Sequence, residues 1–178
     1  YDRDPDGIPR AWVARIRASL SRLTPRFSSN RMLAEYLDRL YLPAAASFRR
    51  RIGQGLKTAR ELRRWMHGLN HHWSGIHWGN LETALRGDQR EYRVQVYLGE
   101  IPPESVAVEL YAEPRGDRGS ERHALRRERT LSGAAGGFLY VGEIPSARPP
   151  GDYTPRVVPA HPEAAIPIET RFIAWYAA

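Results

Sequence analysis

The chain has no cysteine and only one lysine among its 178 residues. The lack of cysteine excludes disulfides, thiolate metal sites and a cysteine nucleophile. Because Lys57 is the only lysine, any Schiff-base chemistry in the chain would have to use that residue. A chain without cysteine is consistent with a cytoplasmic protein, which is the location that we expect.

Long apolar runs are also missing. None approaches the roughly 20 residues of a membrane-spanning helix, and Tyr1–Arg10 does not have the pattern of a signal peptide, so no membrane partner is expected. The chain begins at Tyr1 rather than at a methionine, and we expect it to be a piece of a longer protein. Hydrophobic residues at 42% and charged residues at 26% are typical of a folded globular chain.

Charge is distributed unevenly along the chain. Residues 1–80 carry fourteen Arg and one Lys against six acidic residues, a net charge of +9, whereas residues 81–178 carry twelve Arg against fourteen acidic residues, a net charge of −2. The basic part could bind nucleic acid by counterion release. A solvated helix face, or pairing with acids of another domain, explains the same charges without a nucleic-acid partner. The basic residues at issue are Arg49, Arg50, Arg51, Lys57, Arg60, Arg63 and Arg64.

Apolar residues recur at helical spacing through residues 1–75. The pattern predicts three helices: the first starts at Pro9 and ends at Thr24-Pro25, and Pro43 divides the second from the third. Ser28 or Ser29 can cap the second helix, and Gly53 and Gly55 weaken the third near its start. The apolar stripes contain Ile8, Trp12, Ile16, Leu20, Leu23, Leu33, Tyr36, Leu37, Leu40, Tyr41, Phe48, Ile52, Leu56, Ala59, Leu62, Met66, Leu69 and Trp73.

After Trp73 the apolar period changes from 3.6 to 2, which is typical of half-buried strands. The expected strands include residues 92–98, 106–110, 122–131, 136–144, 153–158 and 168–176. We therefore predict an α+β fold: an N-terminal helical segment (1–75) and an antiparallel, immunoglobulin-like β-sandwich (76–178). Tyr153 has the setting of a tyrosine corner, which ties a turn to the sheet through its hydroxyl group.

Four histidines lie close together in the sequence: His67, His71, His72 and His77. His67 and His71 are spaced i, i+4 on the third predicted helix, a spacing that could chelate zinc. A zinc hydrolase motif would also need an acid, and none lies between them. Interfacial or solvated histidines at a helix end explain the same cluster.

No other motif predicts an active site. Ser28, Ser29 and Ser132 lack the G-x-S-x-G setting of a nucleophile, and residues 132–137 are glycine-rich but favour a hairpin loop over a phosphate loop. The aromatic residues could stack on sugars or form part of the core; they are Trp65, Trp73, Trp78, Tyr97, Tyr111 and Trp175. We assign no catalytic, cofactor-binding or metal-binding residue.

Several strings, in this order, resemble the C-terminal end of bacterial α-glucan (glycogen, maltodextrin) phosphorylases. The helical strings are Tyr1-Asp2-Arg3-Asp4, Gly7-Ile8-Pro9 with Trp12, residues 25–32, Glu35-Tyr36 and residues 41–44. The sandwich strings are residues 94–99, 106–111 and 152–157 and the closing Glu169 and Trp175. The resemblance spans nearly the whole chain.

The resemblance implies phosphorolysis of α-1,4-glucans to glucose-1-phosphate in the full-length enzyme, with pyridoxal phosphate bound to a lysine. It also implies that the glycine-rich catalytic segment of the family is absent here, since the sequence around Lys57 does not match it. The chain would then be a non-catalytic C-terminal part. Its expected partners are the rest of the catalytic domain, α-glucan and, if the enzyme oligomerises, a second copy.

Two other functions remain open at this point. One is a free-standing glycan-binding or scaffold module whose sandwich aromatics stack on sugars. The other is a basic nucleic-acid-binding protein that uses residues 49–64.

Overall fold

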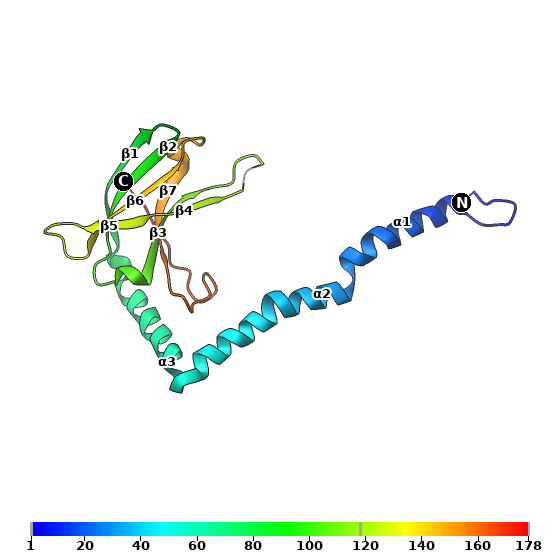
Figure 1. Cartoon of the computed structure of the whole chain (residues 1–178), viewed down its shortest axis with the longest axis horizontal. Helices are drawn as coiled ribbons and strands as arrows, with labels where there is room; N and C mark the ends of the chain where they lie inside the picture. Colours follow the sequence, from blue (N-terminus) through cyan, green and yellow to red (C-terminus); the bar gives the residue numbers. More distant parts are fainter. Residues whose placement is uncertain (1, 118, 178) are drawn as a thin grey trace. The chain divides into compact units, whose positions relative to one another are not determined.

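The computed structural model describes residues 2–117 and 119–177. The chain divides into two compact units, Tyr1–Leu56 and Lys57–Ala178. The first unit is helical, and the second combines the end of a long helix with two antiparallel sheets, so the fold class is α+β. Figure 1 labels the elements of both units.

The helical unit contains α1 (Arg10–Phe27), α2 (Ser29–Tyr36), the π-helical turn η1 (Leu37–Tyr41) and the start of α3 (Leu42–His72). The side chain of Ser28 caps α2 by accepting a hydrogen bond from the backbone N–H of Arg31, which confirms the predicted cap. The prediction that α1 ends at Thr24-Pro25 is wrong, because the helix includes Pro25 and ends at Phe27. Pro25 has no N–H to donate to the carbonyl of Ser21, and the helix ends two residues later.

Pro43 does not divide two helices as predicted, since it lies in the first turn of α3. Just before it, η1 pairs backbone groups five residues apart, with the N–H of Leu42 bonded to the carbonyl of Leu37. A π-turn of this kind shifts the hydrogen-bond ladder, and the first turn of a helix tolerates a residue without an N–H. The predicted weak point is confirmed, because residues 53–56 are non-helical and Gln54 and Leu56 have positive φ.

The second unit contains residues 57–72 of α3 and eight strands. Short 3₁₀ turns lie at Trp73–Gly75, Pro103–Ser105 and Pro150–Asp152. The strands are β1 (His77–Arg86), β2 (Gln89–Tyr97), β3 (Val106–Ala112), β4 (Glu121–Ala124), β5 (Arg126–Thr130), β6 (Gly137–Pro145), β7 (Tyr153–Pro159) and β8 (Ala174–Trp175).

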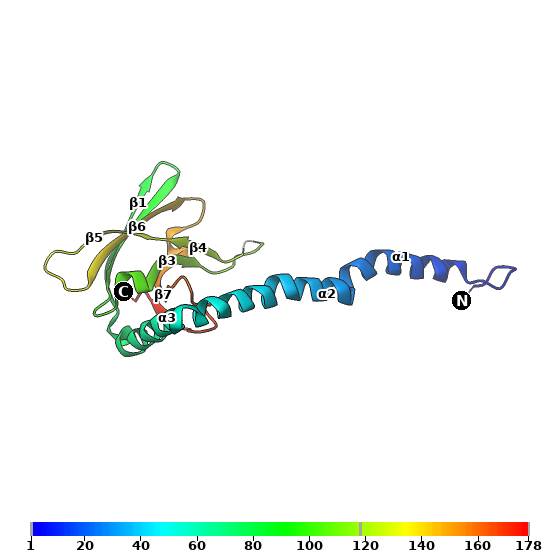
Figure 2. The ribbon, with the colours of Figure 1, turned by 60° about the horizontal axis from the view of Figure 1, so that its bottom comes forward.

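The strands form two four-stranded sheets with the orders β1-β2-β6-β5 and β4-β3-β7-β8, and all printed pairings are antiparallel. Buried residues of both sheets join one core, with Val94 and Val96 from β2 and Leu110 and Val157 from the other sheet. Leu69 of α3 belongs to the same core. Figure 2 turns the ribbon so that the two sheets of this unit can be followed from a second side.

Two predicted strands differ from the structure. Residues 122–131 form two strands in different sheets, and the chain changes sheets at Leu125, which is buried in the core. The reason is that the apolar side chain of Leu125 must face inward, whereas Arg126 and Arg127, which follow it, are charged and exposed. The strand predicted over 168–176 is reduced to Ala174–Trp175.

Candidate functional site

The helices of the first unit expose a long apolar stripe. No described residue of α1, α2 or η1 is buried. The predicted stripe side chains of this unit are instead exposed, with exposed fractions of 60% for Leu20 and 62% for Phe48. An amphipathic helix in water is stabilised mainly by burial of its apolar face, so this surface calls for a covering partner.

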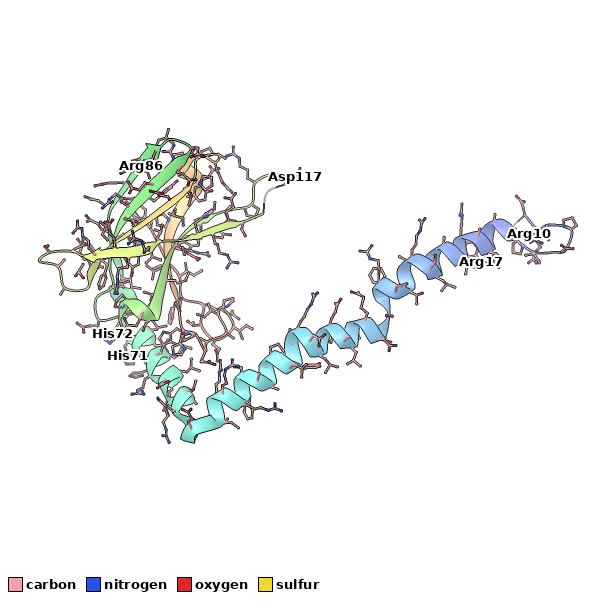
Figure 3. All side chains as sticks on the ribbon, viewed as in Figure 1. Arg10, Arg17, His71, His72, Arg86 and Asp117 are labelled. Atoms are coloured by element: carbon pink, nitrogen blue, oxygen red, sulfur yellow. The ribbon has the colours of Figure 1, made fainter. Side chains whose placement is uncertain are left out.

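The polar side chains of these helices stand away from the ribbon, with Arg10 and Arg17 of α1 labelled in Figure 3. Nearby acids neutralise part of the charge, since Arg31 lies 2.6 Å from Glu35 one turn on. Such exposed i, i+4 pairs contribute little to stability. Of the basic residues between 49 and 64, all but the half-buried Arg51 are exposed, as on a solvated helix face.

Lys57 does not fit a Schiff-base site. Its side chain is 67% exposed and its Nζ lies 4.0 Å from a carboxylate oxygen of Glu61. A lysine that forms a Schiff base is activated by burial or by a neighbouring cation, and Lys57 has an acid beside it instead. The residues present therefore do not form a site for pyridoxal phosphate.

The histidines predicted to lie together do so only in part. The rings of His67 and His71 are 4.0 Å apart, and Nδ1 of His71 lies 3.0 Å from the backbone carbonyl of His67. His71 and His72 are labelled at the end of α3 in Figure 3. Among the described residues no group of three or more metal-ligating side chains converges, and His77 is stacked on Tyr97 in the sheet domain.

The glycine-rich segment 132–137 is the loop between β5 and β6. Gly133 and Gly136 have positive φ, and the backbone of Gly136 packs against Gly99. These are the requirements of a tight loop, which supports the hairpin interpretation.

Three of the predicted aromatic residues belong to the packing of the second unit. Trp65, Trp73 and Trp78 are partly buried against the core. The indole N–H of Trp65 donates to the carbonyl of Ser105, and Trp73 stacks on Phe172. Their role is to hold α3 and the C-terminal segment against the sheets.

The outer face of β3, β7 and β8 brings together Tyr111 and Trp175. Their rings meet edge to face at 5.6 Å, and the guanidinium of Arg156 lies 4.1 Å from the Tyr111 ring centre and 5.1 Å from that of Trp175. Arg156 also donates to Glu109 at 2.7 Å. The arginine thus covers ring faces that a ligand would need. The two rings, Arg156 and Glu109 are already one another's partners.

The outer face of the other sheet places a second aromatic pair on β1 and β2. His77 and Tyr97 are stacked with ring centres 4.6 Å apart and planes only 3° from parallel. The neighbouring strands carry Gly79 and Gly137 beside the Tyr97 ring. A cavity of about 160 Å³ continues along this face, lined by Asn80, Glu82, Arg93, Gln95, Arg129 and Leu139.

A buried arginine organises one corner of the sheet domain. Only 6% of the Arg148 side chain is exposed, and it donates to Glu121, Asp152 and the backbone carbonyl of Glu113. Tyr153 donates to Glu121 at 2.6 Å. Tyr153 therefore ties β7 to β4 through a side chain, whereas a tyrosine corner bonds to nearby upstream backbone.

This corner holds two carboxylates in their charged form. The hydrogen bond from Tyr153 lowers the pKa of Glu121 most, and Arg148 and His123 lower it further. The guanidinium of Arg115, followed by that of Arg148, lowers the pKa of Asp152. Burial, aided by the bond to Glu121, raises the pKa of Tyr153 to about 12.

Sequence reasoning missed the cluster of Glu121, Arg148 and Asp152, because Glu121 lies 27 residues before Arg148 and no motif links them. It also missed the importance of Gly79. A glycine inside a strand pattern indicates a bulge or a close approach, and the register of β1 does shift between Trp78 and Leu81.

The fold and these sites define an accessory segment: a helical part with an uncovered apolar stripe and a sheet domain without a recognisable catalytic constellation among its described residues. The sequence model of the family described as "Glycogen phosphorylase C-terminal domain" matches residues 73–177. The chain belongs to the glycogen phosphorylase family and corresponds to its C-terminal portion.

Two relatives illustrate the similarity. The chain is 32% identical over 175 residues to the glycogen phosphorylase of Mycobacterium tuberculosis (strain ATCC 25618 / H37Rv), a match that covers 93% of this chain and 20% of that protein. It is 30% identical over 100 residues to the maltodextrin phosphorylase of Thermococcus litoralis, which covers 56% of this chain and 12% of that protein.

The chain thus spans about 20% of the length of this mycobacterial relative. No solved structure matches it. Within residues 2–117 and 119–177, none of the helices combines the length and apolar character that crossing a bilayer requires.

Proposed function

We propose that this chain is the non-catalytic C-terminal part of an α-1,4-glucan phosphorylase, which as a whole converts α-glucan and phosphate to glucose-1-phosphate. One observation carries the proposal beyond family membership: α1, α2 and η1 have regular apolar stripes but no buried residue. A surface of this kind is stabilised when a partner covers it. The partner we propose is the remainder of the catalytic domain.

In this proposal the chain has two parts, residues 1–75 and residues 76–178. Within the first part, α1, α2 and η1 pack on the catalytic core, whereas the end of α3 packs on the sheets through Leu69. The second part is a sandwich of the immunoglobulin type. The strand orders support that type, because in chain order β1-β2-β6-β5 corresponds to A-B-E-D and β4-β3-β7-β8 to C′-C-F-G.

Pyridoxal phosphate, in the same proposal, is bound by the part of the enzyme outside this chain, since Lys57 is exposed and lies beside Glu61. The enzyme acts in the cytoplasm. The lack of cysteine supports that location.

Reconstitution from two pieces tests the proposal. The 178-residue chain is mixed with the purified remainder of the phosphorylase, and release of glucose-1-phosphate from maltoheptaose is measured. We expect neither piece to be active alone and the mixture to be active, with association visible by size-exclusion chromatography, which also reports any dimer. A double variant, Leu20→Asp with Leu40→Asp, should weaken association more than tenfold because it charges the stripe.

The matched control places the same two charges outside the stripe, as Ser19→Asp with Asn30→Asp, and should associate normally. Activity of the isolated chain would contradict the proposal. So would equal association of both double variants. The free-standing glycan-binding module and the nucleic-acid-binding protein gain no support from the relatives, which are phosphorylases.

A further inference from the structure

The outer face of the sheet β1-β2-β6-β5 has features that its own packing does not require. Along β2, Tyr92, Val94 and Val96 point into the core, so Arg93, Gln95 and Tyr97 lie on the outer face. Pairing places Leu139 beside Gln95 on the neighbouring strand. The cavity of about 160 Å³ runs over this surface.

Two glycines leave room for Tyr97 to lie across the strands. A Cβ atom on Gly137 would lie 3.1 Å from two ring carbons of Tyr97. One on Gly79 would lie 2.7 Å from Oε1 of Gln95 and 3.2 Å from the opposite edge of the Tyr97 ring. These distances are tighter than ordinary contacts, so the glycines leave room for both Tyr97 and Gln95. An aromatic ring over glycines on a solvent-facing surface contributes little to the core. The glycines therefore serve to position the ring.

The aromatic pair forms one end of this surface. His77 is exposed and Tyr97 half-buried, so the imidazole is the more accessible ring of the parallel stack. The irregularity of β1 between Trp78 and Leu81 places Gly79 and Asn80 next to this pair. Bulges are frequent where a strand re-aims side chains toward a ligand.

Polar groups without partners continue the surface. Among the described residues, the side-chain amides of Asn80 and Gln95 make no hydrogen bond, and both line the cavity. The charged groups are mixed, since Arg93 lies 2.7 Å from Glu128 and 3.5 Å from Glu91. The surface therefore suits a neutral ligand rich in hydroxyl groups rather than a polyanion.

We propose that this face, formed by His77, Asn80, Gln95 and Tyr97, is an accessory binding site for an α-1,4-glucan chain. The proposal rests on the proposed function, since membership of a phosphorylase family suggests which hydroxyl-rich polymer is present. One face of a glucose ring presents C–H bonds that pack on the electron-rich face of an aromatic ring, and its hydroxyl groups pair with amides. The site would hold the polymer near the enzyme without taking part in the reaction.

The other sheet offers a contrast that makes the proposal specific. Tyr111 and Trp175 also lie on an outer face, but Arg156 covers both rings and is itself paired with Glu109. A sugar would have to displace that arginine. We therefore assign glucan binding to the His77–Tyr97 face and not to the Tyr111–Trp175 face.

The test is affinity electrophoresis of the 178-residue chain in gels containing glycogen, with titration calorimetry using maltoheptaose. We expect retardation by glycogen and no retardation by an equal mass of dextran. The double variant Asn80→Ala with Gln95→Ala should bind about tenfold more weakly, as should His77→Ala, because each removes direct ligand contacts. These side chains are at the surface, and the unfolding midpoint should stay unchanged.

The matched control is Thr154→Ala with Val158→Ala on the outer face of the other sheet, which should bind normally. Absence of retardation for the unmodified chain would overturn the proposal, as would equal binding by the Asn80/Gln95 variant. Loss of binding in Trp175→Ala alone would also overturn it by moving the site to the other sheet. If the chain binds glycogen but fails to restore the catalytic remainder, this inference holds and the proposed function fails. If the chain restores the catalytic remainder but does not bind glycogen, the proposed function holds and this inference fails.

Discussion

The helical unit and the sheet unit of this chain treat apolar side chains in opposite ways. In α1, α2 and η1 the apolar residues form regular stripes and no described one is buried, whereas β2 and β3 bury every second residue in a shared core. This difference shows that a periodic apolar pattern identifies the face of an element that will be covered. The pattern does not identify the part of the protein that covers it. The sheets cover each other's apolar faces, whereas the apolar stripes of α1, α2 and η1 are exposed.

The largest effect should come from separating the units. Residues 57–178 alone should unfold in one cooperative thermal transition, followed by circular dichroism, because they contain the complete core. Residues 1–56 alone should lose helicity gradually, since isolated helices of this length are marginal in water. A sharp thermal transition of residues 1–56 would contradict the contrast between the two units.

A matched pair of leucine substitutions measures the same contrast within one chain. Leu110 is fully buried and Leu20 is 60% exposed. Leu110→Ala should lower the free energy of unfolding by about 2–5 kcal/mol, because it leaves a cavity in the core. Leu20→Ala should change it by less than about 0.5 kcal/mol in urea denaturation. Equal losses would show that the helical stripe is buried in the isolated chain.

A glycine pair in the loop 132–137 tests how closely the sheet unit is packed. Gly136 and Gly133 both have positive φ, at 68° and 73°, but only at Gly136 would a Cβ meet backbone, 2.5 Å from the carbonyl oxygen of Gly99. Gly136→Ala should therefore be destabilising by about 1–3 kcal/mol more than Gly133→Ala, in the same urea assay. The control carries the strain of positive φ without the clash. Equal losses would contradict the close approach.

The acid stability of the sheet unit should show the smallest effect. The pKa values of Glu121 and Asp152 are lower in the folded chain than their usual values of 4.5 and 3.8. The unfolded state therefore binds more protons in this range, so stability is present above these usual values and is lost as the pH falls through the lowered ones. Urea midpoints measured across acid pH should fall accordingly, and Glu121→Gln should flatten the dependence. If the urea midpoint of the unmodified chain did not change across acid pH, this prediction would be contradicted.

Tyr153 gives the corresponding test at alkaline pH. Its pKa is raised from 10.0 to about 12, so the folded state favours the neutral phenol. The associated stability is complete below pH 10.0 and is lost as the pH rises toward about 12. Burial also raises the pKa values of Tyr92 and Tyr140, so ultraviolet titration of phenolate should show several late tyrosines, one of which disappears in Tyr153→Phe. If all tyrosines titrated over the same pH range, the hydrogen bond from Tyr153 to Glu121 would be contradicted.

Local chemistry made several elements predictable. Ser28 caps α2 because its hydroxyl reaches a free backbone N–H, and the weak point of α3 occurs at its two closely spaced glycines. The alternation in β2 and β3 was readable because one face of each strand must be buried. The helical stripes likewise predicted which faces need cover.

The same sequence by itself determined the order of helices and strands, the faces to be covered and the absence of thiol chemistry, since each depends on a residue and its near neighbours. Only the tertiary structure decided that residues 121–130 serve two sheets, that Arg148 joins Glu121 to Asp152, and that Gly79 and Gly137 flank Tyr97. Apart from the bond between Arg148 and Asp152, these contacts join residues far apart in the chain. Their positions follow from strand pairing and sheet packing, which no local pattern encodes.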